Sequence, residues 1–125
     1  MIKPPRLKDN DTIGIVAPAR SISEEETETA ISIFKEWGLQ VKQGKHLYSQ
    51  YHQFAGKEKE RAADFQEMVN DPEVRAIFCA RGGYGTIKIM EHLDLEPLRK
   101  DPKWIVGFSD ITVLHSCINQ HYGIQ

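Results

Sequence analysis

Short apolar runs alternate along the chain with longer segments whose apolar residues recur at helical spacing. The run 12–17 (Thr-Ile-Gly-Ile-Val-Ala) is rich in β-branched residues and almost wholly apolar, which is typical of a strand covered on both faces. Comparable runs occupy residues 74–80 and 104–108, and the second of these is expected to be a short buried strand. A shorter and more polar run at 39–42 indicates a strand at a sheet edge.

The segments that follow these runs predict four helices. Ser23 and Glu26 form a capping box at the start of the first helix, which Gly38 ends. The second helix spans about 57–70, the third follows the glycines of 81–85, and the fourth follows the last strand. The residues expected on their inward faces are Ala30, Ile33, Phe34 and Trp37, then Ala62, Phe65, Met68 and Val69, then Ile87, Met90 and Leu93, and finally Leu114, Cys117 and Ile118.

The connection 44–56 is long for a compact domain, and loops of this length are often functional. It carries His46 and His52, which lie six residues apart with no third residue placed to complete a metal site, so we expect surface or packing roles for both. Residues 97–102 are predicted to be a turn region, and residues 123–125 look like the entry to a further strand.

This alternation of strand and helix predicts an α/β fold, a parallel sheet with helices on both faces and right-handed crossovers. Ligands of such sheets bind beyond the carboxyl ends of the strands, near the point where the strand order reverses. The segments 17–19, 81–85 and 109–110 all leave strands at that edge. We therefore expect them to share one rim.

Composition narrows the class without defining a function. A length of 125 residues allows one domain, and 40% hydrophobic with 27% charged residues is ordinary for a soluble protein. The net charge of −2 gives no basic footprint for nucleic acid, and no apolar run approaches a membrane span or a signal peptide. Cys79 and Cys117 are not in a metal-binding spacing, so we expect reduced core thiols in a cytosolic protein, although the spacing leaves a disulfide open.

The candidate chemistry centres on Ser109, where the last strand turns sharply into a helix. A serine on such a corner stands out of the sheet beside free backbone N–H groups, which is the design of a nucleophile elbow. The frame 107–111 (Gly-Phe-Ser-Asp-Ile) lacks the second glycine of the usual motif, and Ser and Asp are also good helix N-caps. The local pattern leaves both interpretations open.

The loop 81–85 (Arg-Gly-Gly-Tyr-Gly) has the glycines of an anion-binding turn, but it matches neither the dinucleotide fingerprint nor a Walker loop. An oxyanion hole suits it better: a glycine N–H would join the Asp110 N–H around the carbonyl that Ser109 attacks. The glycines could equally serve only to make a tight turn. Arg81 could pair with a substrate carboxylate or bridge to a neighbouring acid.

The sequence supplies no convincing base for this serine. His115 lies six residues further along the predicted helix, which is about 9 Å of rise and roughly 240° of rotation, so its ring should not reach Ser109. Spacing singles out no other histidine. Because a serine nucleophile requires a base, we expect part of the active site to lie outside these residues.

Taken in order, these motifs resemble the LD-carboxypeptidase family of serine peptidases, which includes muramoyltetrapeptide carboxypeptidases and microcin-immunity peptidases. The resemblance rests on residues 13–19, 54–56, 60–64, 81–85 and 104–112, and extends over essentially the whole chain. It implies a flavodoxin-like parallel sheet with helices on both faces, similar to the N-terminal domain of class I glutamine-amidotransferase-like proteins.

The resemblance also implies roles for individual residues. Ser109 matches the family's nucleophile, and the backbone N–H groups of Asp110 and Gly83 match its oxyanion hole. The family's catalytic glutamate and histidine lie in a C-terminal domain, so residues 1–125 are expected to be an N-terminal domain without them. The candidate substrate-binding residues are Arg81, Gly82 and Tyr84.

The implied reaction is the hydrolysis, without metal or cofactor, of an amide between an L-centre and a terminal D-residue. It trims murein tetrapeptides during cytoplasmic cell-wall recycling. The implied partners are the murein peptide, the protein's own C-terminal domain and, as a candidate, a second copy of the full-length enzyme; no nucleic acid or membrane is expected.

Without the base, the 125-residue chain is expected to be inactive. Two alternatives rest on fold analogy: a non-catalytic small-molecule-binding α/β module, and a nucleotide-dependent transferase that uses the glycine loop.

Overall fold

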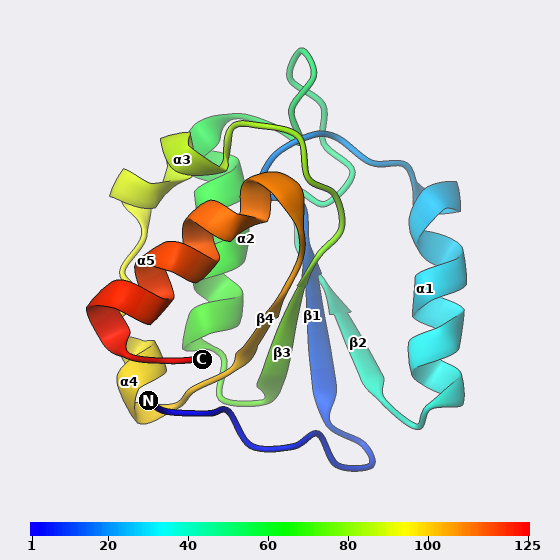
Figure 1. Ribbon diagram of the computed structural model, residues 1–125. Helices are drawn as coiled ribbons and strands as arrows, with labels where there is room; N and C mark the ends of the chain where they lie inside the picture. Colours follow the sequence, from blue (N-terminus) through cyan, green and yellow to red (C-terminus); the bar gives the residue numbers. More distant parts are fainter.

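The computed structural model describes all 125 residues and contains one parallel sheet of four strands in the order β2-β1-β3-β4 (Figure 1). This is the flavodoxin-like order. From β1 the chain adds β2 on one side and then returns to add β3 and β4 on the other, so the strand order reverses between β1 and β3. The predicted fold class is therefore confirmed, with β2 at a sheet edge as expected. The strands are β1 (Thr12–Val16), β2 (Gln40–Gln43), β3 (Val74–Cys79) and β4 (Trp104–Val106).

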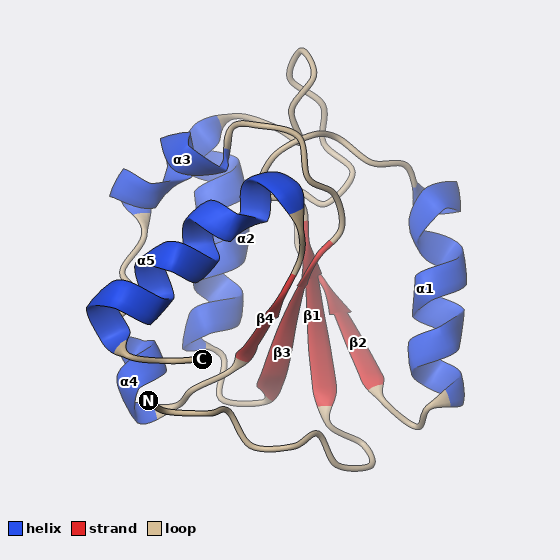
Figure 2. Cartoon of the chain, in the orientation of Figure 1, coloured by secondary structure: helices blue, strands red, loops and turns tan.

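The sheet carries helices on both faces, as Figure 2 shows. Helix α1 (Glu24–Glu36) covers one face alone, and α2 (Glu58–Asn70) and α5 (Thr112–Tyr122) cover the other. The Ser23 and Glu26 capping box is present at the start of α1. The short helices are α3 (Thr86–Ile89) and α4 (Pro97–Lys100), and 3-10 turns occupy Met90–His92 and Ser109–Ile111.

Two apolar clusters hold these layers together. The larger cluster lies between the sheet and the pair α2 and α5, and the predicted inward residues of α2 are all buried within it or beside it. The smaller one lies under α1 around Phe34. Both cysteines are free thiols; Cys79 is buried and Cys117 is half-buried at the margin of the larger cluster.

The prediction for the inward face of α1 was partly wrong. Phe34 is buried, but Ile33 is 38% and Trp37 64% exposed. The buried line of this helix runs instead through Thr27 and Phe34, with Ala30 half-buried between them. No second helix stands beside α1 on this face, so the flank that carries Ile33 faces solvent.

The segment after the glycine loop also differs from the prediction. A single helix was expected, but the structure has the four-residue α3 followed by a 3-10 turn. Ile87 is 67% exposed and Ile89 is buried in its place, because one turn of helix is too short to sustain an inward stripe. The predicted turn region 97–102 contains α4, which has Pro97 in its first turn, where the missing N–H costs nothing.

The prediction of a buried strand over 104–108 was wrong in extent and in burial. Strand β4 ends at Val106, which is 39% exposed, and Phe108 beyond it is 68% exposed. Strand β4 is an edge strand that pairs only with β3, and α1 stands beside β2 at the other edge of the sheet. The backbone leading to Ser109 therefore emerges at the surface.

The two ends of the chain lie side by side (Figure 1). The Ile2 N–H donates to Gly123 O at 2.7 Å, and the Gln125 N–H donates to Ile2 O at 2.7 Å. Residues 123–125, expected to enter a further strand, thus form a single parallel bridge between Ile124 and Ile2. None of the helices is both long enough and apolar enough to cross a membrane.

Candidate active site

Ser109 occupies a strained corner between β4 and α5. Its φ angle is +58°, in the left-handed region that L-residues with a side chain rarely adopt. The side chain is exposed, and none of the hydrogen bonds in the structure involves its Oγ. An N-cap serine would have extended backbone and would bond the helix N–H groups with its side chain. The geometry is therefore not that of an N-cap, and the exposed hydroxyl is what the nucleophile-elbow interpretation expects.

The glycine loop packs directly against this corner. A Cβ on Gly82 would lie 3.1 Å from Ser109 Cβ and 3.2 Å from Phe108 O, so only glycine allows this close approach. Gly83 has a φ angle of +122° and is exposed beside it. The Thr86 N–H donates to Asp110 Oδ2 at 2.9 Å, which joins the start of α3 to the corner.

Two backbone donors are free at this junction. Neither the Gly83 N–H nor the Asp110 N–H donates a hydrogen bond within the chain. Unpaired N–H groups next to an exposed hydroxyl are what a developing oxyanion requires. The family resemblance named these same two residues for an oxyanion hole, a role that stays a prediction.

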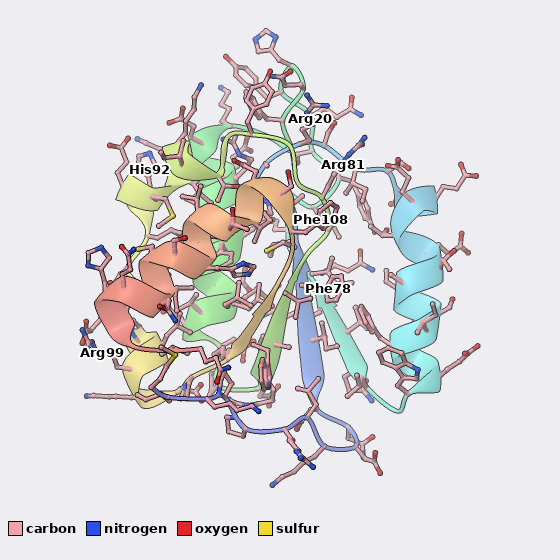
Figure 3. All side chains as sticks on the ribbon, viewed as in Figure 1. Arg20, Phe78, Arg81, His92, Arg99 and Phe108 are labelled. Carbon is pink, nitrogen blue, oxygen red and sulfur yellow. The ribbon has the colours of Figure 1, made fainter.

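The three expected rim segments meet at the carboxyl ends of β1, β3 and β4. Residues of two of them, 81–85 and 109–110, line a depression of about 180 Å³ in front of the serine, and the segment 17–19 contributes to it only through the next residue, Arg20. Figure 3 shows Arg20, Arg81 and Phe108 gathered at this end of the sheet. The residues that line the depression are Arg20, Arg81, Gly82, Gly83, Phe108 and Ser109.

Arg81 is already engaged within the chain. Its Nη1 donates to Ser21 O at 3.2 Å and lies 3.9 Å from Glu26 Oε1. The side chain is about half exposed, so the ion pair is weak. Of the two roles that the sequence left open for Arg81, the contact with Glu26 corresponds to the bridge to a neighbouring acid, and the pairing with a substrate carboxylate stays a prediction.

Arg20 was not predicted as a site residue. Its guanidinium lies 5.3 Å from the centre of the Tyr84 ring, and its Nε is buried without a hydrogen-bond partner. Tyr84 is half exposed, and its hydroxyl accepts a hydrogen bond from Gln53 Nε2 in the long loop. Tyr84 thus connects the glycine loop to the segment 44–56.

Arg61 organises the loops around the site, and sequence reasoning missed this role too. It is 2% exposed and donates to Pro18 O at 2.9 Å, Gly56 O at 2.9 Å and Gly85 O at 3.3 Å. Burial lowers the pKa of its guanidinium, and the nearby acids only partly oppose this shift. Its position four residues before Phe65, on the inward stripe of α2, is a signal that could have identified it.

No histidine lines the depression in front of Ser109. His115 Nε2 lies 3.0 Å from Ile105 O in β4, in agreement with the expectation that its ring points away from Ser109. His46 Nδ1 lies 3.3 Å from Glu60 Oε2, and His52 is exposed in the long loop.

One group of side chains has donor atoms close enough together for a metal ion. Glu58, Glu91 and His92 each offer an atom within 4.8 Å of the others. They lie at the surface and contribute nothing to the lining of the depression in front of Ser109. The donor set therefore gives no reason to place a metal at the serine.

The fold and the site together define a class of protein: a flavodoxin-like α/β domain that presents an exposed serine on a strand-to-helix elbow beside a glycine loop. Within that class, the chain belongs to the LD-carboxypeptidase family, because residues 13–125 match the LD-carboxypeptidase N-terminal domain.

Known relatives agree with this assignment. The chain is 45% identical over 122 residues to the probable murein peptide carboxypeptidase of Bacillus subtilis, covering 98% of this chain and 38% of that protein. It is 31% identical over 110 residues to the murein tetrapeptide carboxypeptidase of Pseudomonas aeruginosa, covering 87% and 36%. The crystal structure of an MccF-like protein from Bacillus anthracis superposes with a TM-score of 0.91 at 30% identity, covering 98% and 38%. The chain therefore spans less than two fifths of the length of these proteins.

Proposed function

We propose that Ser109 is the nucleophile of a serine-type carboxypeptidase that acts on murein peptides. The observation that carries the proposal is the left-handed backbone of Ser109, which holds an unbonded hydroxyl beside the free N–H groups of Gly83 and Asp110. The names of the relatives from Bacillus subtilis and Pseudomonas aeruginosa support murein peptides as the substrate.

In the proposed reaction, Ser109 Oγ attacks the carbonyl carbon of the last amide bond and its proton passes to a base. The carbonyl oxygen becomes an oxyanion that accepts hydrogen bonds from the Gly83 and Asp110 N–H groups, each worth roughly 3 kcal/mol in the transition state. The protonated base then gives its proton to the leaving nitrogen, and the terminal residue departs as a free amino acid. A water molecule then gives a proton to the base and attacks the acyl carbon, and Ser109 Oγ leaves and regains the proton from the base.

The base and its orienting acid belong, in this proposal, to a C-terminal domain of a longer protein. The position of His46 beside Glu60 and the hydrogen bond of His115 with Ile105 O support this division between domains, and so does the greater length of the relatives. The 125-residue chain alone should then have no measurable turnover, because a triad without its base loses almost all of its rate advantage.

The same proposal names the partners and the compartment. The murein peptide is the substrate, the C-terminal domain packs against the rim, and a second copy of the full-length enzyme is a candidate partner. The two free cysteines support a reducing, cytoplasmic environment.

The test is release of the terminal D-residue from a murein tetrapeptide by the full-length protein. Ser109→Ala should lower kcat/KM by at least about 10³-fold. Ser116→Ala, at an exposed position of α5, is the matched control and should leave it unchanged. A fluorophosphonate probe should label Ser109. Unchanged activity of Ser109→Ala would favour the non-catalytic module, and turnover by the 125-residue chain would show that the base lies inside it.

A further inference from the structure

Two cations and no acid line the depression in front of Ser109. Arg81 is occupied by Ser21 O and lies near Glu26, but the Arg20 side chain donates no hydrogen bond and pairs with no carboxylate in the structure. An unpaired guanidinium beside an exposed hydroxyl is a site for an anion. We propose that Arg20 binds the terminal carboxylate of the peptide substrate, an inference that rests on the proposed function.

The backbone of Arg20 is held in place by the loop opposite. Arg20 forms an antiparallel bridge with Phe54, flanked by hydrogen bonds from the Ala55 N–H to Ala19 O and from the Ser21 N–H to Gln53 O, each of 3.0 Å. The residue follows β1 by only a few positions. The side chain therefore starts from a fixed point on the rim.

The side chain is fixed as well. It crosses directly over Gly83: a Cβ there would lie 2.5 Å from Arg20 Cγ, 2.7 Å from Cδ and 3.0 Å from Nε. Its guanidinium packs on the Tyr84 ring, which favours a cation and limits rotation. Gly83 thus has two reasons to lack a side chain: its own positive φ angle and the path of Arg20. The guanidinium is held beside the same residue whose N–H is proposed to bind the oxyanion.

A carboxypeptidase must bind the free carboxylate at the end of its substrate, next to the bond that it cleaves. The terminal carboxylate is only two bonds from the nitrogen of the bond that is cleaved. The group that binds the carboxylate must therefore lie, in space, about one residue's length from the nucleophile. A guanidinium presents a planar fork of N–H donors that fits both oxygens of a carboxylate. The buried and unpartnered Nε of Arg20 is a donor that such a ligand would satisfy.

The test compares two substrates on the full-length protein: a peptide with a free C-terminal carboxylate and the same peptide with a C-terminal amide. The wild-type protein should prefer the free acid. Arg20→Gln should raise KM for the free acid by about 10- to 100-fold, the range for a lost charge-assisted hydrogen bond, with little change for the amide. Arg20→Lys should recover part of the preference. Arg6→Gln, an exposed arginine near the start of β1 without a hydrogen bond in the chain, is the charge-matched control.

The outcomes separate this inference from the proposed function. Equal losses on both substrates in Arg20→Gln, or no preference for the free acid in the wild-type protein, would overturn the role of Arg20 while the loss of activity in Ser109→Ala still stood. Activity retained in Ser109→Ala would overturn the proposed function itself. Fluorophosphonate labelling at the wild-type rate shows that the variant is folded, and if Arg20→Gln does not fold, the substrate ratio of Arg20→Lys decides.

Discussion

Ser109, the proposed nucleophile, has a strained backbone. A left-handed φ angle costs a residue with a Cβ about 1–2 kcal/mol, and the surrounding structure must supply it. The contact with Gly82 on one side and the hydrogen bond from Thr112 Oγ1 to Ser109 O at 2.7 Å on the other hold the corner in place.

Ser109→Gly removes the proposed nucleophile, but it should give a more stable protein than Ser109→Ala does. Glycine adopts the left-handed region without the Cβ penalty, so the free energy of unfolding should rise by about 1 kcal/mol relative to Ser109→Ala, which keeps the Cβ. Urea denaturation of the three proteins measures this difference. If the alanine variant were as stable as the glycine variant, the corner would carry no strain.

Asp64 shows how one buried carboxyl gives the fold a pH dependence. Its side chain is 4% exposed and accepts a hydrogen bond from the His46 N–H at 2.8 Å. Burial raises the pKa of this carboxyl above its ordinary value, and the hydrogen bond from His46 only partly offsets the shift. The folded protein thus holds the Asp64 proton at a pH where the unfolded chain has released it.

The contribution of Asp64 to stability should accordingly fall as the pH rises from about 4 through the raised pKa. Asp64→Asn cannot ionise but can still accept the His46 N–H. Its stability relative to the wild-type protein should therefore increase across that window and then stay constant. Urea midpoints measured between pH 3.5 and 7 test this, and a difference that did not change with pH would contradict it.

At the scale of elements, α2 supports the site through Arg61. The helix lies under the sheet, and one side chain from its first turn binds carbonyl groups of three separate loops, at Pro18, Gly56 and Gly85. The guanidinium also packs on the Phe54 ring at 4.6 Å. The geometry of the rim thus depends on a helix that does not line the depression.

Arg61→Met should lower the free energy of unfolding by about 3 kcal/mol, because it leaves buried carbonyl groups without donors. Lys59→Met, at an exposed position of the same helix, should change it by less than about 0.5 kcal/mol. Chemical denaturation of both variants makes the comparison. Equal effects would show that solvent replaces the hydrogen bonds of Arg61.

The sequence predicted the elements that are long enough to carry a pattern. The capping box of α1, the inward stripe of α2 and the edge position of β2 could all be predicted from periodicity and composition. The one-turn helices α3 and α4 could not, because four residues do not define a period. The exposure of Trp37 could not either, since it depends on whether another helix stands beside α1.

At the scale of the whole molecule, the two faces of the sheet are covered unequally. Parallel sheets are normally covered on both faces, but over β3 and β4 the face that carries α1 is open. The result is an apolar depression of about 400 Å³ whose lining includes Trp37, Phe78, Trp104 and Val106.

The 125-residue chain should therefore bind a fluorescent apolar dye such as anilinonaphthalene sulfonate in its native state. Val106→Lys places a charge in the lining and should reduce this fluorescence. Ile87→Lys, an equally drastic change at an exposed position outside the depression, should not. Identical dye signals from the two variants would show that the binding occurs elsewhere.

The position of the site was predictable at this scale, but its electrostatics were not. Parallel topology alone brings the ends of β1, β3 and β4 to one rim, so the neighbourhood of Ser109 and the glycine loop could be expected. Which arginine is free could not, because Arg81 finds its acceptor at Ser21, sixty positions away in the chain. The base for Ser109 could not be predicted from these residues either, because its proposed source is another domain.

The parallel bridge between Ile2 and Ile124, in which Ile2 is hydrogen-bonded to Gly123 and Gln125, has a consequence for the order of the chain. Where chain ends already touch, a few glycines would close the backbone into a ring, and the ring could be cut again at the exposed tip around His52. The strands of such a circular permutant would follow one another in a different order along the chain. The backbone would still be continuous through the segments that follow β1, β3 and β4.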